Sequence, residues 1–590
     1  MLIARFSLRR TTVRNPPVFC ATKPDHLEGS ARLFADNHLL SVHRKQPACH
    51  KVLSTFLSFL SSPCSALLLS PVRMDTFPTE ILAKVFSECL PDFDEPYPLI
   101  STSVPPMLFT TVNQRWREVA CSSPQLWTRL HIKINVTADL LQAAQPTVKW
   151  KRLQHKGEAI SRWFERSAKC KVYVSFEIVN YGLESVSFFL RNKTFDELML
   201  PMLDSICTYS KQWERLKLHK IDEPYRSRIL SIPTEDLPRL THLSFKGYEA
   251  TTYPLSSFKS FLTLKESGAI RASLLSSLRL KALSPQDRLQ DLPLSNWANL
   301  QELEFSNGYD SYSDRYMDMA SAETLLRRCQ NLVSLSLTIR KGGPPLAHPS
   351  ENIVLPRLKS LNLQESCGDP QGDPFLTPFL SLLKLSALTQ LVTTAGVQPG
   401  RNQEASLMTL IKANESTFSK TLTKVEFEYN YLNQDELKEC LKLLPAATHI
   451  TMTASSMYPY REMESIYSHP PHFAVFWNLD ELTPSPIDPE NEELGVTCLL
   501  PKLEHFYFSL ARQEEFEDDE LVDFVERRIN YAGFPYNEIG EPVVKLKYVY
   551  GGFVSEQKID VHEEVEKRGV NLDGVKIEVD YELECQCLSI

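Results

Sequence analysis

The sequence carries one motif with recognisable reactive chemistry. Cys587-Leu588-Ser589-Ile590 has the form of a C-a-a-X signal for attaching a prenyl chain to a cysteine thiol, and Cys585 is a candidate acylation site beside it. Two features oppose this interpretation. Ser589 is polar where an aliphatic residue is preferred, and residues 580–584 are rich in acids rather than basic. We therefore expect no membrane association unless Cys587 is prenylated.

Motifs for catalysis are missing from the sequence. It has no Gly-x-x-x-x-Gly-Lys-Ser/Thr phosphate loop, no Gly-x-Gly-x-x-Gly, no His-Glu-x-x-His and no Gly-x-Ser-x-Gly. The 14 histidines are dispersed, and a content of only 19 glycines disfavours a nucleotide cradle. We expect a protein that is not an enzyme, with no catalytic residues, no metal ligands and no cofactor.

Composition and charge narrow the classes of partner. With 590 residues, 43% of them hydrophobic, the chain is long enough for several domains or one repeat array and is not dominated by disorder. Residues 1–73 hold ten lysines and arginines against three acids, whereas the whole chain has a net charge of −9, so the remainder is acidic. We expect no nucleic acid partner. The 13 cysteines include no C-x-x-C pair, which favours a reduced compartment, the cytoplasm or nucleus.

The first 73 residues are set apart as an extension. Met1 to Pro24 contain five basic residues and no acid, which resembles a mitochondrial presequence. The alternative is a disordered extension, or a start at Met74. We favour this alternative because the segment after Met74 has the pattern of a folded domain.

Residues 74–130 predict short amphipathic helices. Phe77, Ile81 and Val85 form one apolar stripe and Leu82, Phe86 and Leu90 a second, before Pro91, Pro96 and Pro98 end the helix. A second helix is expected from about Pro106, with Leu108, Val112, Trp116, Val119 and Ala120 on one face. Trp127 follows as a further aromatic anchor, before a β-like segment at His131 to Ile134.

This order of motifs resembles the F-box, in the version common in large fungal families. The pieces are Phe-Pro-Thr-Glu-Ile-Leu-x-x-Val-Phe, Val-x-x-Arg-Trp-Arg-x-Val-Ala and Ser-Pro-x-Leu-Trp, spread over about 57 residues. Two features depart from the family pattern. Asn113 stands where the family often has Cys, and the stretch from Pro91 to Pro106 is longer than in the shortest F-boxes.

The resemblance implies a three-helix hook that docks on the adaptor Skp1 and, through it, on a cullin. So small a unit has too little interior for all its apolar side chains, which independently suggests a covering partner. The alternative is that these helices cap the first repeat of the next domain. The implied partner-binding positions are Phe77, Pro78, Ile81, Leu82, Val85, Phe86, Val112, Trp116 and Trp127.

From about residue 170 the chain repeats the pattern apolar-x-x-apolar-x-apolar. Starts differ by 25 to 35 residues, as in leucine-rich-type repeats, each with one strand and a return segment. The clear copies start at Trp213, Leu240, Leu275, Leu300, Leu332, Leu358, Leu422 and Leu503, and weaker ones at Leu388, Ala447 and Phe473.

The return segments predict helices at two places. Leu437, Leu441 and Leu444 have helical spacing after Asn433, a good N-cap, and Leu521, Val525 and Ile529 have it after the acids of 518–520. Alternating strands and helices predict parallel strands. Only the copy at Leu422 carries the turn asparagine of regular repeats, Asn430, so we expect an irregular solenoid.

The predicted fold is therefore α/β: an extension over 1–73, a three-helix F-box over 74–130 and a leucine-rich-repeat-like solenoid over 131–590. By resemblance, the function is that of a substrate-recognition adaptor in a Skp1–cullin–F-box (SCF) ubiquitin ligase, with the solenoid binding an unidentified target protein. Two alternatives stay open: a Skp1-bound scaffold without a degradation role, and a mitochondrial repeat protein that uses the N-terminal extension.

Overall fold

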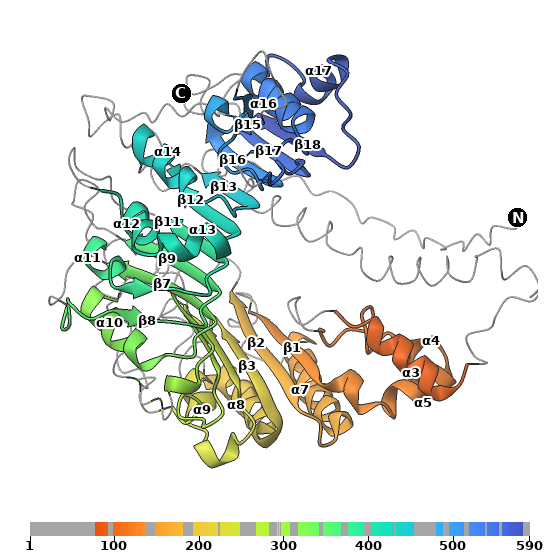
Figure 1. Ribbon diagram of the computed structural model, residues 1–590. Coiled ribbons are helices and arrows are strands. Elements are labelled where there is room, and N and C mark those ends of the chain that lie inside the picture. The colour runs from red at the N-terminus through yellow and green to blue at the C-terminus, as the bar shows by residue number, and fades with distance from the viewer. Residues whose placement is uncertain are drawn as a thin grey trace, which may run out of the picture. The chain divides into compact units, whose positions relative to one another are not determined.

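The computed structural model describes most of the chain after residue 76 (Figure 1). The described residues are 77–91, 98–136, 148–180, 193–221, 225–247, 267–281, 292, 294, 297–306, 317–340, 346–366, 376–394, 404–429, 432–453, 479–487, 495–511, 518–536, 540–553 and 557–581. The extension, the repeat at Phe473, Asn430 and the motif at Cys587 lie outside them. The chain divides into two compact units, Met1–Pro91 and Asp92–Ile590.

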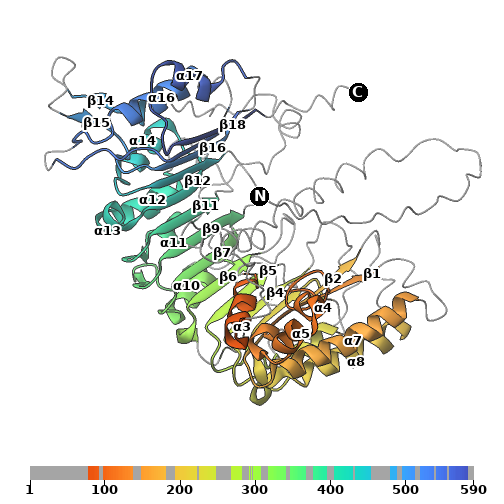
Figure 2. The ribbon, with the colours of Figure 1, turned by 90° about the vertical axis from the view of Figure 1, so that its right-hand side faces the viewer.

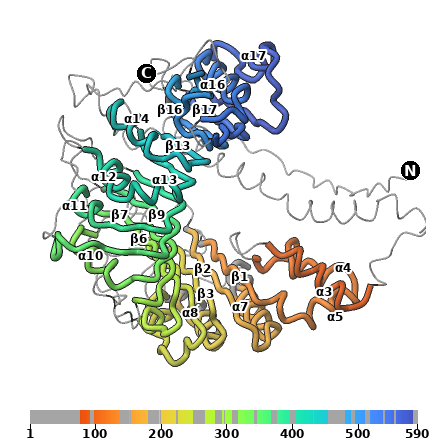
Figure 3. The backbone as a smooth tube through the Cα atoms, in the orientation of Figure 1, coloured from red at the N-terminus to blue at the C-terminus, as the bar shows by residue number. Residues whose placement is uncertain are grey.

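A parallel sheet of fourteen strands dominates the second unit. Each strand pairs with the next one along the chain, apart from the short strands that belong to other sheets, so the chain follows one course through the sheet (Figure 3). The sheet is open, as a solenoid requires. Its strands are β1 (Arg129–Val136), β2 (Val172–Asn180), β3 (Trp213–His219), β4 (His242–Lys246), β5 (Ser277–Lys281), β6 (Glu302–Ser306), β7 (Ser334–Arg340), β9 (Ser360–Ser366), β11 (Gln390–Thr394), β12 (Lys424–Glu428), β13 (His449–Thr453), β16 (His505–Ala511), β17 (Tyr548–Phe553) and β18 (Lys576–Tyr581).

The remaining strands of the described residues form two small two-stranded sheets. β8 (Ile353–Val354) pairs with β10 (Leu383–Lys384) in parallel, and β14 (Ser485–Pro486) pairs with β15 (Val496–Thr497) in antiparallel fashion.

The repeat pattern explains the sheet. The first apolar residue of each copy lies just before its strand or, at Trp213, begins it, and the other two lie on the strand at alternate positions. In register, Leu216, Leu243, Leu278 and Leu303 form one buried column across β3 to β6. Because side chains alternate along a strand, the intervening polar residues face the other way. The predicted parallel α/β solenoid is thus present from β1 onward.

Helices lie along one face of this sheet, as Figure 2 shows for α10 to α13. The helices are α7 (Val148–Ser167), α8 (Lys193–Cys207), α9 (Tyr225–Leu230), α10 (Met319–Arg328), α11 (Thr377–Leu380), α12 (Ser406–Ala413), α13 (Glu415–Thr421), α14 (Gln434–Lys442), α16 (Asp518–Asn530) and α17 (Val561–Lys567). Short 3-10 turns are η5 (Ser210–Gln212), η6 (Thr234–Asp236), η11 (Trp297–Asn299) and η13 (Leu479–Glu481).

Both predicted return helices are confirmed. Asn433 caps α14 by accepting a hydrogen bond from the Glu436 amide at 2.8 Å, and the Glu436 carboxylate accepts one from the Asn433 amide, which completes a capping box. Helix α16 begins at Asp518, and its acids occupy the first turn as expected.

The segment before β1 holds four short helices. In the first unit, α3 (Thr79–Glu88) is the described helix, with Pro78 at its N-cap. The second unit holds α4 (Phe109–Val112), α5 (Gln114–Cys121) and the 3-10 turn η3 (Pro124–Trp127). The continuous second helix expected from Pro106 is wrong, because Asn113 takes an extended conformation that ends α4 and caps α5.

Among the described residues, no helix is long and apolar enough to cross a membrane, and no cluster of three or more acidic, cysteine or histidine side chains is arranged to hold a metal ion.

Candidate functional site

Helix α3 presents part of the predicted partner-binding face to solvent. Ile81 is 49% exposed, whereas Leu82 and Phe86 on the neighbouring stripe are buried. Phe77 and Val85 are half-buried, and Pro78 is exposed. The two stripes of the sequence pattern therefore differ: one is covered within the chain, and Ile81 on the other is open to a partner.

Helices α4 and α5 carry a second exposed apolar position. Val112 is 51% exposed at the end of α4. Trp116 on α5 is half-buried, with its ring at 6.2 Å from that of Phe109 in an edge-on arrangement. The Trp116 amide donates to the Asn113 side chain at 2.8 Å. Asn113, the residue that departs from the family pattern, is thus an N-cap that fixes the start of α5.

Trp127 is placed inside the chain. It is fully buried, its indole donates to the Ala120 carbonyl at 2.7 Å, and its ring lies edge-on to Trp163 of α7 at 4.9 Å. Trp127 occupies the first apolar position of a repeat copy, two residues before β1, and Trp213 occupies the same position of the copy that forms β3. The segment Trp127-Thr-Arg-Leu-His-Ile is therefore the first copy of the repeat, and its tryptophan offers no surface to a partner.

The nine predicted partner-binding residues fall into three classes of exposure. Pro78, Ile81 and Val112 are exposed; Phe77, Val85 and Trp116 are half-buried; Leu82, Phe86 and Trp127 are buried. The structure brings Val112 and Trp116 together on α4 and α5, and it places the Phe77 to Phe86 group on and beside α3.

A second candidate surface is the polar side of the sheet, which we call the open strand face. It consists of the strand residues that alternate with the buried ones. From β1 to β5 it is mainly basic, with Lys133, His219, Lys246 and Lys281 in one register row. From β7 to β11 it carries hydroxyl and amide groups, such as Ser336, Asn362 and Gln364. Sequence reasoning missed this surface because its members meet only once the register is known.

The basic part of this face holds a hydrogen-bonded Ser-His-Glu group. His131 Nδ1 lies 3.0 Å from Ser175 Oγ, and His131 Nε2 lies 3.4 Å from Glu177 Oε2. The hydrogen bond to His131 lowers the pKa of Glu177 to about 2, and burial lowers the pKa of His219 beside it to about 4. These types of group could relay a proton, but Ser175 is 5% exposed, which withholds its hydroxyl from a substrate.

Aromatic side chains take over the open strand face from β13 to β17. The rings of His449 and His505 stack at 4.1 Å and 8°, and those of Tyr507 and Tyr550 stack at 4.3 Å and 6°. Tyr548 donates to Glu578 at 2.7 Å and Tyr550 to Asp580 at 2.9 Å. We call this group the aromatic ladder. It combines flat apolar area with carboxylates, a combination that suits protein recognition.

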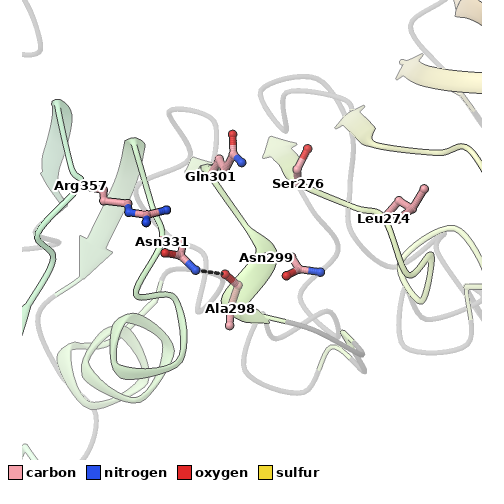
Figure 4. A pocket seen from close by; sticks show the side chains of 7 residues that line it. All are labelled: Leu274, Ser276, Ala298, Asn299, Gln301, Asn331 and Arg357. Atoms are coloured by element: carbon pink, nitrogen blue, oxygen red, sulfur yellow. Dashed lines mark hydrogen bonds between the residues drawn. The ribbon is translucent and has the colours of Figure 1, made fainter.

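A shallow pocket of about 230 Å³ lies where several strands begin (Figure 4). It is lined by Leu274, Ser276, Ala298, Asn299, Gln301, Asn331 and Arg357, which precede β5, β6, β7 and β9. The Asn331 amide donates to the Ala298 carbonyl at 2.9 Å, as Figure 4 shows, so this side chain ties neighbouring turns together. The lining holds no acid or histidine that could exchange a proton near neutral pH.

Comparison with known proteins found no matching protein-family model and no matching curated protein.

Proposed function

We propose that this chain is a substrate-recognition adaptor of a Skp1–cullin–F-box ubiquitin ligase. The helical segment from Phe77 to Ala120 docks on a Skp1-type adaptor, and the open strand face of the solenoid holds the target protein. The chain breaks and forms no bonds itself. It raises the local concentration of target lysines near a charged conjugating enzyme.

The observation that carries the docking step is the distribution of exposed apolar side chains. Seven large ones are exposed among the described residues, and four of them, Ile81, Leu99, Leu108 and Val112, fall within the predicted F-box. Exposed apolar side chains mark positions that another chain can cover, here Ile81 on the first unit and Leu99, Leu108 and Val112 on the second. The motif order of the F-box gives that second chain its identity.

The target-binding step is supported by the regular arrangement of the open strand face. Parallel repeats create an extended surface whose side chains are held at fixed spacing, and solenoids use such surfaces for partners. The buried Ser175 hydroxyl and the absence of catalytic motifs favour binding over catalysis.

The proposed compartment is the cytoplasm or the nucleus. The alternative, import into mitochondria, depends on residues 1–24, which lie outside the described residues. Fractionation of cells that express the chain with a C-terminal fluorescent tag distinguishes the two, since import would place the fluorescence in the mitochondrial fraction.

Docking is tested with the double variant Ile81→Asp/Val112→Asp in a pull-down with a purified Skp1-type adaptor. Both side chains are half exposed, so the acids disturb an interface more than the fold. Replacing a central side chain of an interface costs about 2 kcal/mol or more, so we expect the double variant to bind at least a hundredfold more weakly.

The matched control is Val354→Asp/Ile487→Asp, which makes the same kind of change at positions 55% and 54% exposed in the solenoid. It should bind the adaptor as the natural chain does. Equal binding by the natural chain and the Ile81→Asp/Val112→Asp variant would refute the docking proposal.

A further inference from the structure

In the register row of Tyr507 and Tyr550, the aromatic ladder ends at a short side chain, Thr451. Thr451 of β13 pairs in register with Glu426 of β12 on one side and with Tyr507 of β16 on the other. Thr451 is short, so the ring face of Tyr507 that points away from Tyr550 has only the threonine beside it in this row. Two strand spacings, about 9–10 Å, separate the backbones that carry the Glu426 carboxylate and the Tyr507 ring.

The neighbouring register row has a large side chain on β13 where this row has Thr451. There His449 replaces the short threonine, and its ring stacks on His505 at 4.1 Å. We call the position where the short Thr451 stands between Glu426 and Tyr507 the slot.

One wall of the slot carries a carboxylate. Glu426 is exposed, and it forms no ion pair with another described residue. Lys424, on the same strand, lies one row away beside His449, whose pKa it helps to lower after burial and His505. A group that enters the slot therefore meets a carboxylate on one wall and the negative face of an aromatic ring on the other.

Elsewhere in the chain, a tyrosine ring and a carboxylate together bind a cationic side chain. At the other end of the ladder, Lys576 Nζ lies over the ring of Tyr548, 5.6 Å from its centroid, and forms an ion pair with Glu578 at 2.5 Å. A tyrosine face, a carboxylate and a cation are thus already combined on β17 and β18. At Thr451 the tyrosine face and the carboxylate are present, and among the described residues neither takes part in an ion pair or a cation–π contact.

From this geometry we infer that the slot bounded by Glu426, Thr451 and Tyr507 binds an arginine side chain from a target protein. The guanidinium stacks on Tyr507 within about 6 Å of the ring centroid and donates paired hydrogen bonds to Glu426. Arginine is preferred to lysine because its group is planar, more weakly hydrated and matched to a carboxylate. This inference rests on the proposed function of the open strand face as the target-binding surface.

The test uses saturation-transfer NMR on the full chain, with N-acetyl-arginine methylamide as the probe and its lysine and citrulline counterparts beside it. The saturation-transfer signal should be strongest for the arginine probe, at its δ-methylene. It should be weaker for the lysine probe and weakest for the neutral citrulline probe. Glu426→Gln should weaken arginine binding about tenfold, because a charge-assisted hydrogen bond becomes a neutral one.

Thr451→Leu fills the slot and leaves both walls in place, so it should abolish the signal. Ser336→Leu is its matched control, since Ser336 occupies the same register row on β7, is equally half-buried and has no aromatic neighbour there. Circular dichroism confirms that both variants fold. Equal signals from arginine and citrulline, or an undiminished signal from folded Thr451→Leu, would overturn the inference.

The two experiments can fail independently of each other, because the arginine slot and the docking positions are changed by different variants. Thr451→Leu should bind the Skp1-type adaptor normally, and Ile81→Asp/Val112→Asp should bind the arginine probe normally.

Discussion

Arg528 shows how one residue can be essential to the fold and yet invisible in the sequence pattern. The helix was predicted with Leu521, Val525 and Ile529 inward, yet Arg528 is fully buried and Ile529 only half-buried. The guanidinium donates to the carbonyls of Leu482, Leu499 and Leu500 at 2.6–2.9 Å. Burial lowers its pKa, and the three carbonyls compensate part of the desolvation.

We predict that Arg528→Leu lowers the free energy of unfolding by about 3 kcal/mol, because it removes three charge-assisted hydrogen bonds from a buried site. The Leu500 and Leu499 carbonyls keep the Leu503 amide and the Cys498 thiol as donors, whereas the Leu482 carbonyl loses its side-chain donor. Urea denaturation followed by tryptophan fluorescence measures the loss. Arg527→Leu, one residue earlier on the exposed side of α16, is the control and should change the midpoint little. A stability equal to that of the natural chain in Arg528→Leu would show that the three bonds contribute nothing net.

Elements were predictable wherever the repeat kept its spacing. Eight clear copies, from Trp213 to Leu503, and the weaker copies at Leu388 and Ala447 all coincide with strands of the sheet. The spacing of apolar residues is enough to predict these strands, because every repeat must supply a side chain to the same buried columns of the sheet.

Strands were missed where packing altered the pattern. In β2 a bulge between Val172 and Tyr173 removes one residue from the spacing. In β17 the third apolar position is Gly551, because a side chain there would lie 2.7 Å from the ring of Phe508. These strands depend on neighbours that sequence spacing alone does not reveal.

The last strand of the sheet depends on side-chain bonds more than on burial. Ile577 and Val579 of β18 are only half-buried, whereas their counterpart Val549 on β17 is fully buried. The hydroxyls of Tyr548 and Tyr550 hold β18 through Glu578 and Asp580. Burial and the bond to Glu578 raise the pKa of Tyr548 to about 12, so it stays a donor at neutral pH.

We therefore predict that Tyr548→Phe/Tyr550→Phe speeds amide exchange in β18 about thirtyfold, since it removes two hydrogen bonds that contribute about 1 kcal/mol each. Hydrogen-exchange mass spectrometry of a peptide covering 574–581 measures the rate. Tyr536→Phe is the control, because it removes a tyrosine–carboxylate bond, to Glu541 at 2.6 Å, outside β18. Unchanged exchange in the double variant would mean that backbone pairing alone holds the strand.

At the scale of the whole molecule, two kinds of surface occur on one chain. The helical segment offers apolar side chains such as Ile81 and Val112, which suit a stable partner, and the open strand face offers charged and aromatic ones. Exposure of the helical residues was foreseeable from the small size of the segment, although only part of its apolar face is open. The aromatic ladder was not foreseeable, because Tyr507 and Tyr550 are 43 residues apart and meet only through strand register.

A ligase adaptor and a scaffold differ in the proteins that the chain holds together. If the chain links a target to a cullin, the cullin must co-purify with it through the Skp1-type adaptor. We predict that the natural chain, expressed with an affinity tag in its host cells while proteasomes are blocked, retains both proteins. Ile81→Asp/Val112→Asp should retain neither, and Thr451→Leu should keep both while its ubiquitinated target disappears from the preparation. Recovery of the Skp1-type adaptor without any cullin would instead establish a scaffold, since the apolar docking surface would then serve assembly alone.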